Sequence, residues 1–194
     1  MQRMPRKYEL KRRAERQEET RRRIVEAATD LHATVGPART TVSAIADRAG
    51  VQRHTVYSHF PRERDLYDAC SGLHLELNPF PDPEAWLRTE PGEGRLREGL
   101  RELYAWYAAN ESLMANVTRD AEVHPILRDV AEARFGPALG RMRETLAEGL
   151  GGGRRTLALI GLALELRTWR SLVRGGGLDA DEAVEAMVTA LRCR

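Results

Sequence analysis

The sequence predicts an all-α fold: an N-terminal three-helix domain containing a helix-turn-helix, followed by a larger helical domain, with about nine helices in all. Apolar residues recur at helical spacing from about residue 20 onward, and no stretch of the 194 residues shows the alternation of a β-strand. Prolines and glycine clusters separate the helical segments. With 42% hydrophobic and 31% charged residues, the composition is that of a globular protein with its own core.

The charge is unevenly distributed along the chain. Residues 1–64 hold 15 Lys and Arg against 8 Asp and Glu, a balance of +7, whereas the remainder holds 16 against 21, a balance of −5, which together give the net charge of +2. A basic first third joined to an acidic remainder is typical of a polyanion-binding domain attached to a domain of another kind.

The sequence contains no signal for a membrane span or for secretion. No apolar run approaches the roughly 20 residues that a transmembrane helix needs. The basic N-terminus lacks the apolar region of a secretory signal, so we expect a cytoplasmic protein. Cys70 and Cys193 fit neither a metal-binding nor a disulfide spacing, which agrees with a reducing compartment. Cys70 fits a small buried hydrophobic residue better than a redox sensor.

No pattern in the sequence indicates catalysis. A phosphate-binding glycine loop, an HExxH motif and a GxSxG motif are all missing. Histidines occur at positions 32, 54, 59, 74 and 124, too far apart to suggest a ligand cluster. We therefore expect a protein that is not an enzyme, with no catalytic residue, no metal and no cofactor.

The first 19 residues are polar and rich in Arg and Lys, and three interpretations stay open. They can form a flexible arm that reaches into a minor groove, a helical extension of the next segment, or a frayed solvated end. The first helix is expected from about Thr20, as N-cap, to Val35, where Gly36 and Pro37 end it. Its inward face carries four apolar residues: Ile24, Ala27, Ala28 and Leu31.

The segment Thr41–Phe60 has the pattern of a helix-turn-helix. Thr41 is suited to cap a short helix whose apolar face comprises Val42, Ile45, Ala46 and Ala49. Gly50 permits the left-handed backbone that ends such a helix and turns the chain. A second short helix follows, with Val56 and Phe60 facing inward. The second helix of this motif can enter the major groove of DNA, whereas the alternative is an ordinary helical hairpin within a core.

The run TTVSAIADRAGVQRHTVYSHFPRERDLY, residues 40–67, resembles the DNA-binding domain of the TetR family of bacterial transcriptional regulators. The shared features are Thr40 and Thr41, Ile45 and Ala46, Ala49 to Val51, Tyr57, His59 and Phe60, then Arg64 and Asp65. The resemblance covers about a quarter of the chain and implies a dimeric, ligand-responsive regulator. It also assigns Tyr57, His59 and Arg64 to backbone phosphates of the operator.

The remaining candidate DNA contacts follow from their places on the two helices. Thr41 and Ser43 begin the first helix of the motif, where hydroxyls and free N–H groups can bind a phosphate. Gln52, Arg53, His54 and Thr55 begin the second helix, so we expect them to read bases. Arg53 can bond guanine bidentately, Gln52 can bond adenine, and the Thr55 methyl can contact thymine.

A fourth helix is predicted to open at Pro61 and to continue to Leu77, ahead of a loop with three prolines. We expect the domain boundary within this helix. The predicted parts are a basic extension (1–19), a DNA-binding domain (20–66) and a helical ligand-binding and dimerisation domain (67–194).

The second domain is predicted to be helical throughout. A short helical piece is expected around Glu84–Arg88, then a long helix through Leu96 and Tyr107, and a separate segment over Glu111–Arg119. Another helix is expected from Pro125 to Leu146, with glycines 151–153 after it.

The last two predicted helices carry the most apolar surface. The segment Thr156–Val173 includes LALIGLALEL, which is apolar nearly all round. Asp179 is suited to cap the final helix, whose stripe comprises Ala183, Val184, Met187, Val188 and Leu191. We expect these helices, about 156–173 and 179–193, to form a homodimer interface, whereas the alternative is an ordinary core within one subunit.

Aromatic and other large side chains in the second domain are candidates for a pocket between helices. They are Tyr104, Trp106, Tyr107, Met114, His124, Phe135 and Trp169. Aromatic residues at helical spacing also suit a packed core, so residue by residue that alternative is the simpler one.

Taken together, the sequence predicts a dimeric repressor that binds a pseudo-palindromic DNA operator and leaves it when a small molecule of unknown identity binds. One alternative is a DNA-binding activator or architectural protein without a ligand. Another is a helical ligand-binding or enzymatic protein whose helix-turn-helix is incidental.

Overall fold

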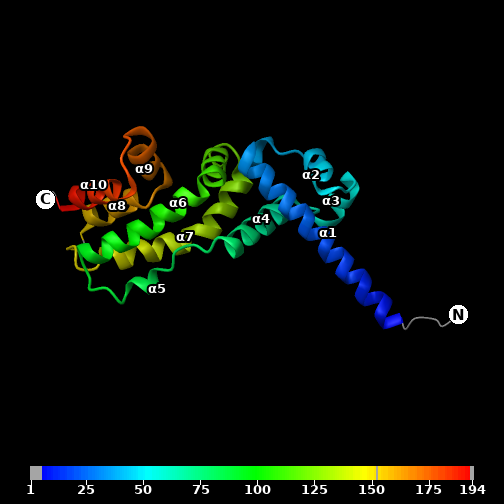
Figure 1. Ribbon diagram of the computed structural model, residues 1–194, viewed down its shortest axis with the longest axis horizontal. Helices are drawn as coiled ribbons and strands as arrows, with labels where there is room; N and C mark the ends of the chain where they lie inside the picture. The colour runs from blue at the N-terminus through cyan, green and yellow to red at the C-terminus, as the bar shows by residue number, and fades with distance from the viewer. Residues whose placement is uncertain (1–5, 152, 193–194) are drawn as a thin grey trace.

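The computed structural model describes residues 6–151 and 153–192 and shows an elongated molecule of two helical parts (Figure 1). Within these ranges it has ten α-helices and no strand, so the predicted all-α fold is confirmed. We call residues 6–70 the head and the remaining described residues the body. Residues 1–5 of the expected extension and Cys193 lie outside the described residues.

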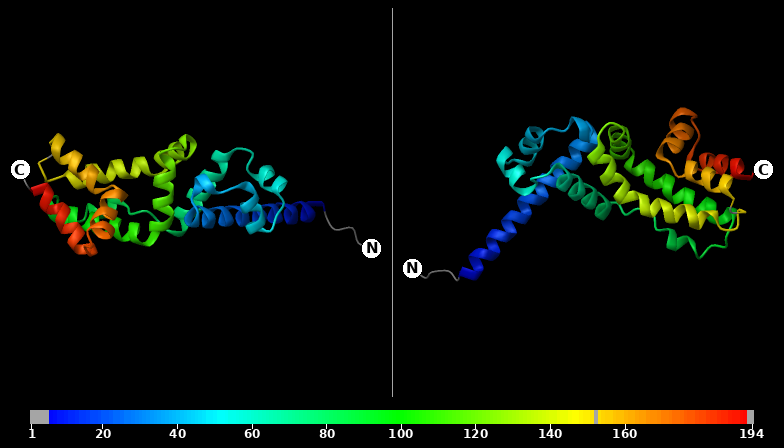
Figure 2. Two further views of the ribbon diagram at one scale, coloured as in Figure 1. Left: turned by 90° about the horizontal axis from the view of Figure 1, so that it is seen from above. Right: turned by 180° about the vertical axis from the view of Figure 1, so that it is seen from behind.

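Helix α1 (Arg6–Thr34) is much longer than predicted. The expectation that Thr20 caps its start is wrong, because the Thr20 hydroxyl donates to the carbonyl of Arg16, 2.8 Å away, inside the helix. Residues 6–19 contain neither Gly nor Pro and are rich in strong helix formers, so nothing in them ends the helix. Of the three interpretations of this segment, the helical extension is the one observed, and it projects away from both parts (Figure 2).

The head packs α1, two short helices and the first half of α4 (Glu63–Leu77) around one core. The short 3-10 helix η1 (Pro37–Arg39) leads into α2 (Val42–Ala49) and α3 (Arg53–His59), and the core they form is closed by α1 and α4. The core is made of small and branched apolar side chains, among them Ile24, Ala28, Ile45, Ala46, Val56, Phe60 and Leu66. Cys70 joins this core, and burial raises the pKa of its thiol to about 12.

Helix α4 connects the head to the body. It begins at Glu63 and not at Pro61, because Arg62 is extended and occupies the N-cap position. The Arg62 guanidinium donates to both carboxylate oxygens of Asp65, at 2.6 and 3.0 Å, which orders this first turn. The α4 helix contributes to the head core and also packs on α7, so it belongs to both parts.

The body is built on two long helices, α6 (Glu93–Ala121) and α7 (Pro125–Ala147), and the short α5 (Pro83–Trp86) packs against both. The two segments predicted around Tyr107 and Glu111 form one helix, α6. A kink marks the predicted gap, because Asn110 has a non-helical backbone (φ −116°, ψ 15°). The Asn110 side chain donates to the carbonyl of Trp106 at 2.8 Å within this bend.

The helix predicted over Thr156–Val173 is instead broken into α8 (Arg154–Ala163), α9 (Leu166–Arg170) and a π-helical turn, η2 (Ser171–Gly175). Glu165 is extended at the break. The carbonyls of Ala163 and Leu164, which lose their helical partners there, accept from the hydroxyls of Tyr104 (3.0 Å) and Tyr107 (2.6 Å). Two buried tyrosines of α6 therefore stabilise the break.

The final helix, α10 (Ala180–Arg192), begins with the predicted cap. Asp179 and Glu182 each accept from the other's backbone N–H at 2.9 Å, which forms a capping box. The apolar face of α10 packs against α6 and α8, and Ala183, Val184, Met187 and Val188 are buried. The stripe that predicted a dimer interface is thus covered within the subunit.

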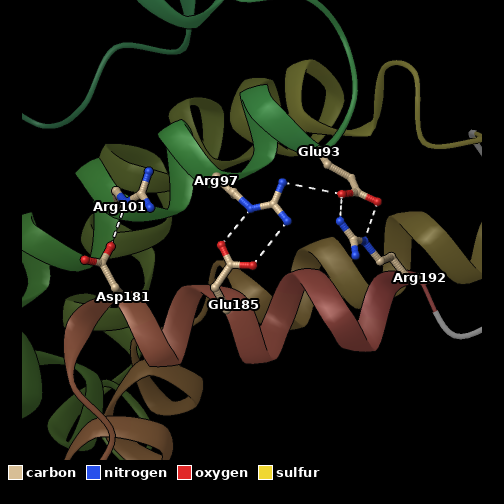
Figure 3. Close-up of polar contacts among 6 residues, drawn as sticks. All are labelled: Glu93, Arg97, Arg101, Asp181, Glu185 and Arg192. Carbon is tan, nitrogen blue, oxygen red and sulfur yellow. Dashed lines mark hydrogen bonds and ion pairs between the residues drawn. The ribbon is translucent and has the colours of Figure 1, made fainter.

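Ion pairs along α10 fix its register on α6 (Figure 3). Arg101 pairs with Asp181 at 2.7 Å and Arg97 with Glu185 at 2.6 Å, and Glu93 pairs with both Arg97 and Arg192. Each of these exposed pairs contributes little by itself, but together they form a network along the charged side of α10.

We predict that Tyr107→Phe destabilises the body. The change removes a hydroxyl and leaves the buried carbonyl of Leu164 without its partner, at a cost of about 1–3 kcal/mol. The urea midpoint of unfolding measures the effect. Tyr57→Phe is the matched control, because Tyr57 is exposed and its hydroxyl has no partner within the described residues. Equal midpoints for the wild type and Tyr107→Phe would contradict this account of the helix break.

Candidate nucleic-acid interface and adjoining cleft

The turn between α2 and α3 has the geometry that the sequence predicts. Gly50 adopts the left-handed conformation (φ 65°, ψ 39°). The N–H of Val51 donates to the backbone carbonyl of Ala46 at 3.0 Å, and the N–H of Gly50 donates to the backbone carbonyl of Asp47 at 3.3 Å. This pair of bonds is a Schellman motif, which ends α2 and directs the chain into α3. The small Ala46 is buried between the two helices.

The N-terminus of α2 is arranged to receive an anion. The Thr41 hydroxyl oxygen accepts from the N–H of Ala44 at 3.1 Å, so Thr41 is the predicted N-cap and keeps its own proton free to donate. The first backbone N–H groups of a helix have no partner inside the helix, and they add positive partial charge. Ser43 lies half-buried beside them. Together these groups suit a phosphate oxygen.

The first turn of α3 presents polar side chains to solvent. Gln52 occupies the N-cap position without using its side chain for capping. Gln52, Arg53 and His54 are exposed and Thr55 is half-buried, while Val56 is buried in the head core. No described residue pairs with Arg53, so its guanidinium is free to bind. A helix that reads base edges in a groove needs free polar side chains in its first turn, and this turn has them.

The three residues expected on phosphates lie at the end of α3 and the start of α4. Tyr57 is 50% exposed and His59 is half-buried, and neither side chain has a partner in the described structure. Arg64 is exposed and lies 3.7 Å from Asp68 one turn later. A pair this loose and exposed is readily exchanged for a phosphate.

Arg21 of α1 supports this end of α3. Its guanidinium lies over the ring of Phe60 at 4.3 Å and donates to the carbonyl of His59 at 3.3 Å. The sequence shows Arg21 only as one of three consecutive arginines, and its role depends on contacts 38 residues away along the chain.

A polar joint connects the head to the last turns of α6. The carboxylate of Asp120, 5% exposed, accepts from the N–H of Ala38 in η1 at 2.9 Å and from Arg119 at 2.8 Å. Burial pushes the pKa of Asp120 up, but these hydrogen bonds outweigh it and hold the pKa below the usual range. Gly36 must be a glycine here: its φ is +96°, and an added Cβ would lie 2.6 Å from an Asp120 oxygen.

Asn116 of α6 completes the joint. Its amide nitrogen donates to the carbonyls of His32 (3.0 Å) and Ala33 (2.9 Å), which lie in the last turn of α1 and lack partners within that helix. The Arg119 guanidinium donates to the Asn116 side-chain oxygen at 2.9 Å. Side chains from about one turn of α6 thus form hydrogen bonds with free backbone groups of η1 and of the C-terminal end of α1.

A second set of contacts joins α4 to the α6–α7 turn. Tyr67 packs with Leu127 and Val130, and its hydroxyl donates to Glu63 at 3.0 Å. His124 lies 3.3 Å from the same Glu63 oxygen and caps α7. His124, a candidate for the ligand pocket, therefore lies at the joint between head and body.

His32 is buried in this joint, 5% exposed, with its ring 5.6 Å from that of Tyr67. Burial lowers the pKa of His32 to about 4, against a smaller opposite effect of the Asp120 charge. The imidazole is therefore neutral at physiological pH.

The body contains a cleft of about 940 Å³ between α6, α7 and the α8–α9 break, a volume typical of a small-molecule site. Its lining is mainly apolar, with Phe80, Tyr107, Met114, Phe135, Leu139, Leu157 and Leu164 among its residues. Gly136, Gly140 and Gly161 also line it, so the helices leave room that larger side chains would fill. Arg128, Glu132, Arg143 and Glu165 bring both signs of charge to the lining.

Three of the seven sequence candidates for the pocket line this cleft: Tyr107, Met114 and Phe135. Tyr104, Trp106 and Trp169 belong to the body core and are not among the lining residues. Sequence reasoning missed Leu164 and the glycines, because the cleft depends on a helix break that periodicity does not reveal.

The cleft and the joint share one segment of α6. Met114, Val117, Thr118 and Ala121 line the cleft, while Asn116, Arg119 and Asp120, interleaved with them along the helix, bind the head. A shift of this segment therefore changes both places. None of the described helices is long and apolar enough to cross a membrane, and no group of three or more His, Cys, Asp or Glu in the described residues is placed to hold a metal ion.

Comparison with known proteins identifies the head. Residues 24–70 match the sequence profile of the bacterial regulatory proteins of the tetR family. The head therefore has the sequence profile of a TetR-type DNA-binding domain. The match spans α2, the Gly50 turn and α3, together with the parts of α1 and α4 that form the head core.

Two curated TetR-type relatives, both from Pseudomonas putida, match over about the same length of chain. The chain is 42% identical over 66 residues to the HTH-type transcriptional regulator TtgR and 41% identical over 68 residues to the HTH-type transcriptional regulator SrpR. The match covers 34% of this chain in both cases, and 31% and 32% of the relatives. The aligned region is thus about a third of each relative's length.

Solved structures share the fold over nearly the whole chain. HlyIIR, a hemolysin II transcriptional regulator, superposes with a TM-score of 0.68 over 92% of this chain and 99% of its own, at 19% identity. NalD is the secondary repressor of the MexAB-OprM multidrug efflux pump in Pseudomonas aeruginosa. It superposes with a TM-score of 0.61 over 91% of this chain and 95% of its own, at 24% identity. The fold that these structures share therefore extends through both the head and the body.

We predict that Arg53→Ala weakens binding to the preferred DNA by about 1–3 kcal/mol and relaxes specificity at one base pair. The reason is that Arg53 is exposed at the start of α3 and has no partner among the described residues. Affinities for single-base variants of the site measure the effect. Arg62→Ala is the control, because Arg62 is already paired with Asp65. An equal loss on every sequence would make Arg53 a phosphate contact and contradict the assignment.

We predict that acid destabilises the joint through His32. The pKa of His32 is about 4 in the folded chain and about 6.5 in the unfolded chain. Below pH 6.5 the unfolded chain therefore binds more protons, and the free energy of unfolding decreases as the pH is lowered. Between pH 7 and pH 5 this amounts to about 2 kcal/mol. Urea unfolding at both pH values, for wild type and His32→Phe, isolates the contribution. An identical pH dependence in the two proteins would contradict it.

Proposed function

We propose that this chain is a sequence-specific DNA-binding transcriptional regulator. The observation that carries the proposal is the first turn of α3, where Gln52, Arg53 and His54 are exposed on a helix held by a Schellman turn, within a head that matches the tetR family. Gln52, Arg53, His54 and Thr55 would read bases in the major groove. Thr41, Ser43, Tyr57, His59 and Arg64 would hold phosphates and fix the register.

We further propose that it acts as a repressor released from DNA by a small molecule. Supporting this, the cleft has the size and apolar lining of a ligand site. Solved structures of the same fold include NalD, named as a repressor, and FadR from Bacillus subtilis in complex with stearoyl-CoA. A ligand in the cleft would favour one position of α6, and its effect on DNA affinity cannot exceed its differential affinity for the two states.

We propose that the regulator is a homodimer through the last two helical segments, about 156–173 and 179–193. The exposed side of α8 supports this, because Leu162 is 47% exposed there. The apolar stripe of α10 lends no support, since it packs within the subunit. Two heads would then meet successive major grooves about 34 Å apart.

The division into a DNA-binding domain (20–66) and a ligand-binding and dimerisation domain (67–194) also stays a proposal. Its support is that Leu66 contributes to the head core, whereas Tyr67 packs against α7. Cys70 and Leu73 still pack with the head, so α4 does not divide sharply.

Selection of bound duplexes from a random pool tests the proposal. We predict a pseudo-palindromic site that the chain binds about 10³-fold or more over random DNA. Both affinities should fall across a salt series while the preference for the selected site persists. Binding without an enriched sequence, with affinity that simply collapses as salt rises, would contradict the function.

A further inference from the structure

Among the described residues, one side-chain polar atom is fully buried and has no hydrogen-bond partner: Nε2 of His74. His74 lies near the C-terminal end of α4, the helix that connects head and body. Buried polar groups in proteins are almost always paired, and each exception calls for a physical explanation. A ligand group that completes the hydrogen bond is one such explanation.

The other ring nitrogen determines what Nε2 can do. The side-chain nitrogen of Asn78 lies 3.5 Å from Nδ1 of His74 and donates to the His74 carbonyl at 3.1 Å. An amide nitrogen only donates, so Nδ1 accepts and the ring proton lies on Nε2. Burial lowers the pKa of His74, which keeps the ring neutral. His74 therefore offers one uncharged N–H donor that lacks an acceptor.

His74 lines a small cavity of about 50 Å³ between α1, α4, α6 and α7. The hydroxyls on the cavity wall are already used: Thr29 donates to Val25, Tyr67 to Glu63 and Ser71 to Asp68. No Lys or Arg is among the described residues that line it. A carboxylate would lose its hydration here without gaining a cation, so the cavity suits an uncharged acceptor.

This cavity adjoins the large cleft. Met114, Val117, Ala131 and Phe135 line both. Methionine is flexible and adapts to neighbouring groups, so the wall between the two spaces includes one side chain, Met114, that can change its rotamer when a ligand extends toward His74. The outer end of such a ligand would lie near Arg128, Glu132, Arg143 and Glu165, which tolerate polar groups of either sign.

We propose that the effector is an elongated, mainly apolar molecule that lies in the cleft and accepts a hydrogen bond from Nε2 of His74 through an uncharged oxygen, such as a ketone or ester carbonyl. The inference rests on the proposed function, because it takes the cleft as the effector site. It adds the residue that anchors the ligand and the chemical class recognised. Because His74 is on α4, the ligand would contact the helix that carries the head.

Benzophenone and diphenylmethane provide the test, since they differ at one carbon, which carries a ketone oxygen in benzophenone and two hydrogens in diphenylmethane. Isothermal titration calorimetry of both compounds with the wild type and His74→Phe forms a double-mutant cycle between the carbonyl and the N–H. We expect the wild type to bind the ketone about two- to tenfold more tightly than the hydrocarbon, and His74→Phe to lose that preference. Thermal melting of each variant verifies that it folds.

Two further variants sharpen the result. His74→Gln can place an amide N–H near the position of Nε2 and should restore part of the preference for the ketone. Ser71→Ala, in the same cavity, should leave it unchanged, because the Ser71 hydroxyl already donates to Asp68. Equal loss of both compounds in His74→Phe, an unchanged preference, or a wild type that binds neither compound would each overturn the proposal. Selection of bound DNA duplexes by the wild type tests the proposed regulator function separately, because its result does not depend on whether benzophenone binds.

Discussion

The buried carboxylate of Asp120 holds the two parts of this molecule together. It takes the N–H of Ala38 from the head and the guanidinium of Arg119 from its own helix, and the carboxylate itself is almost entirely shielded from water. Such charge-assisted bonds are about twice as strong as neutral ones. Gly36 leaves room for the Asp120 carboxylate and the Arg119 guanidinium, which a Cβ at this position would meet. Without the bond, the head would be held through α4, the packing around Tyr67 and the Asn116 bonds to the end of α1.

The same part of α6 forms a wall of the cleft, and this gives a physical basis for coupling. Residues that face the ligand space and residues that bind the head alternate within about two turns of one helix. A packed helix moves as a unit and has few discrete positions. A ligand that prefers one of these positions would favour one orientation of the head. If DNA prefers another orientation, bound DNA would lower the affinity for the ligand by the same factor by which the ligand lowers the affinity for DNA.

Irregular helices make the cleft possible. The kink at Asn110 and the break after Ala163 are both stabilised by side chains of α6: Asn110 bonds the Trp106 carbonyl, and Tyr104 and Tyr107 bond the freed carbonyls at the break. Straight helices in these places would pack more closely over the apolar lining. Glycines of α7 and α8 in the lining keep the space open. The apolar cleft thus depends on polar bonds that lie around it.

The helix-turn-helix could be predicted from the sequence because its determinants are local. Thr41 and Gly50 act within a few residues of themselves, as cap and turn, and Val56 follows the turn at helical spacing. The start of α1 could not be placed, because the signal at Thr20 is an exposed hydroxyl that bonds within the helix. The α8–α9 break and the joint at Asp120 depend on partners 57 to 82 residues away along the chain. His74 as a donor depends on its burial, which no pattern of neighbouring residues reveals.

The most direct test of the coupling is the affinity of benzophenone for the chain with and without its selected DNA duplex. The account predicts that bound DNA changes this affinity in the wild type, and that the change largely disappears in Asp120→Ala, where the joint is opened. A folded wild type that binds benzophenone equally well in both conditions would contradict it. Cleft and head would then act independently.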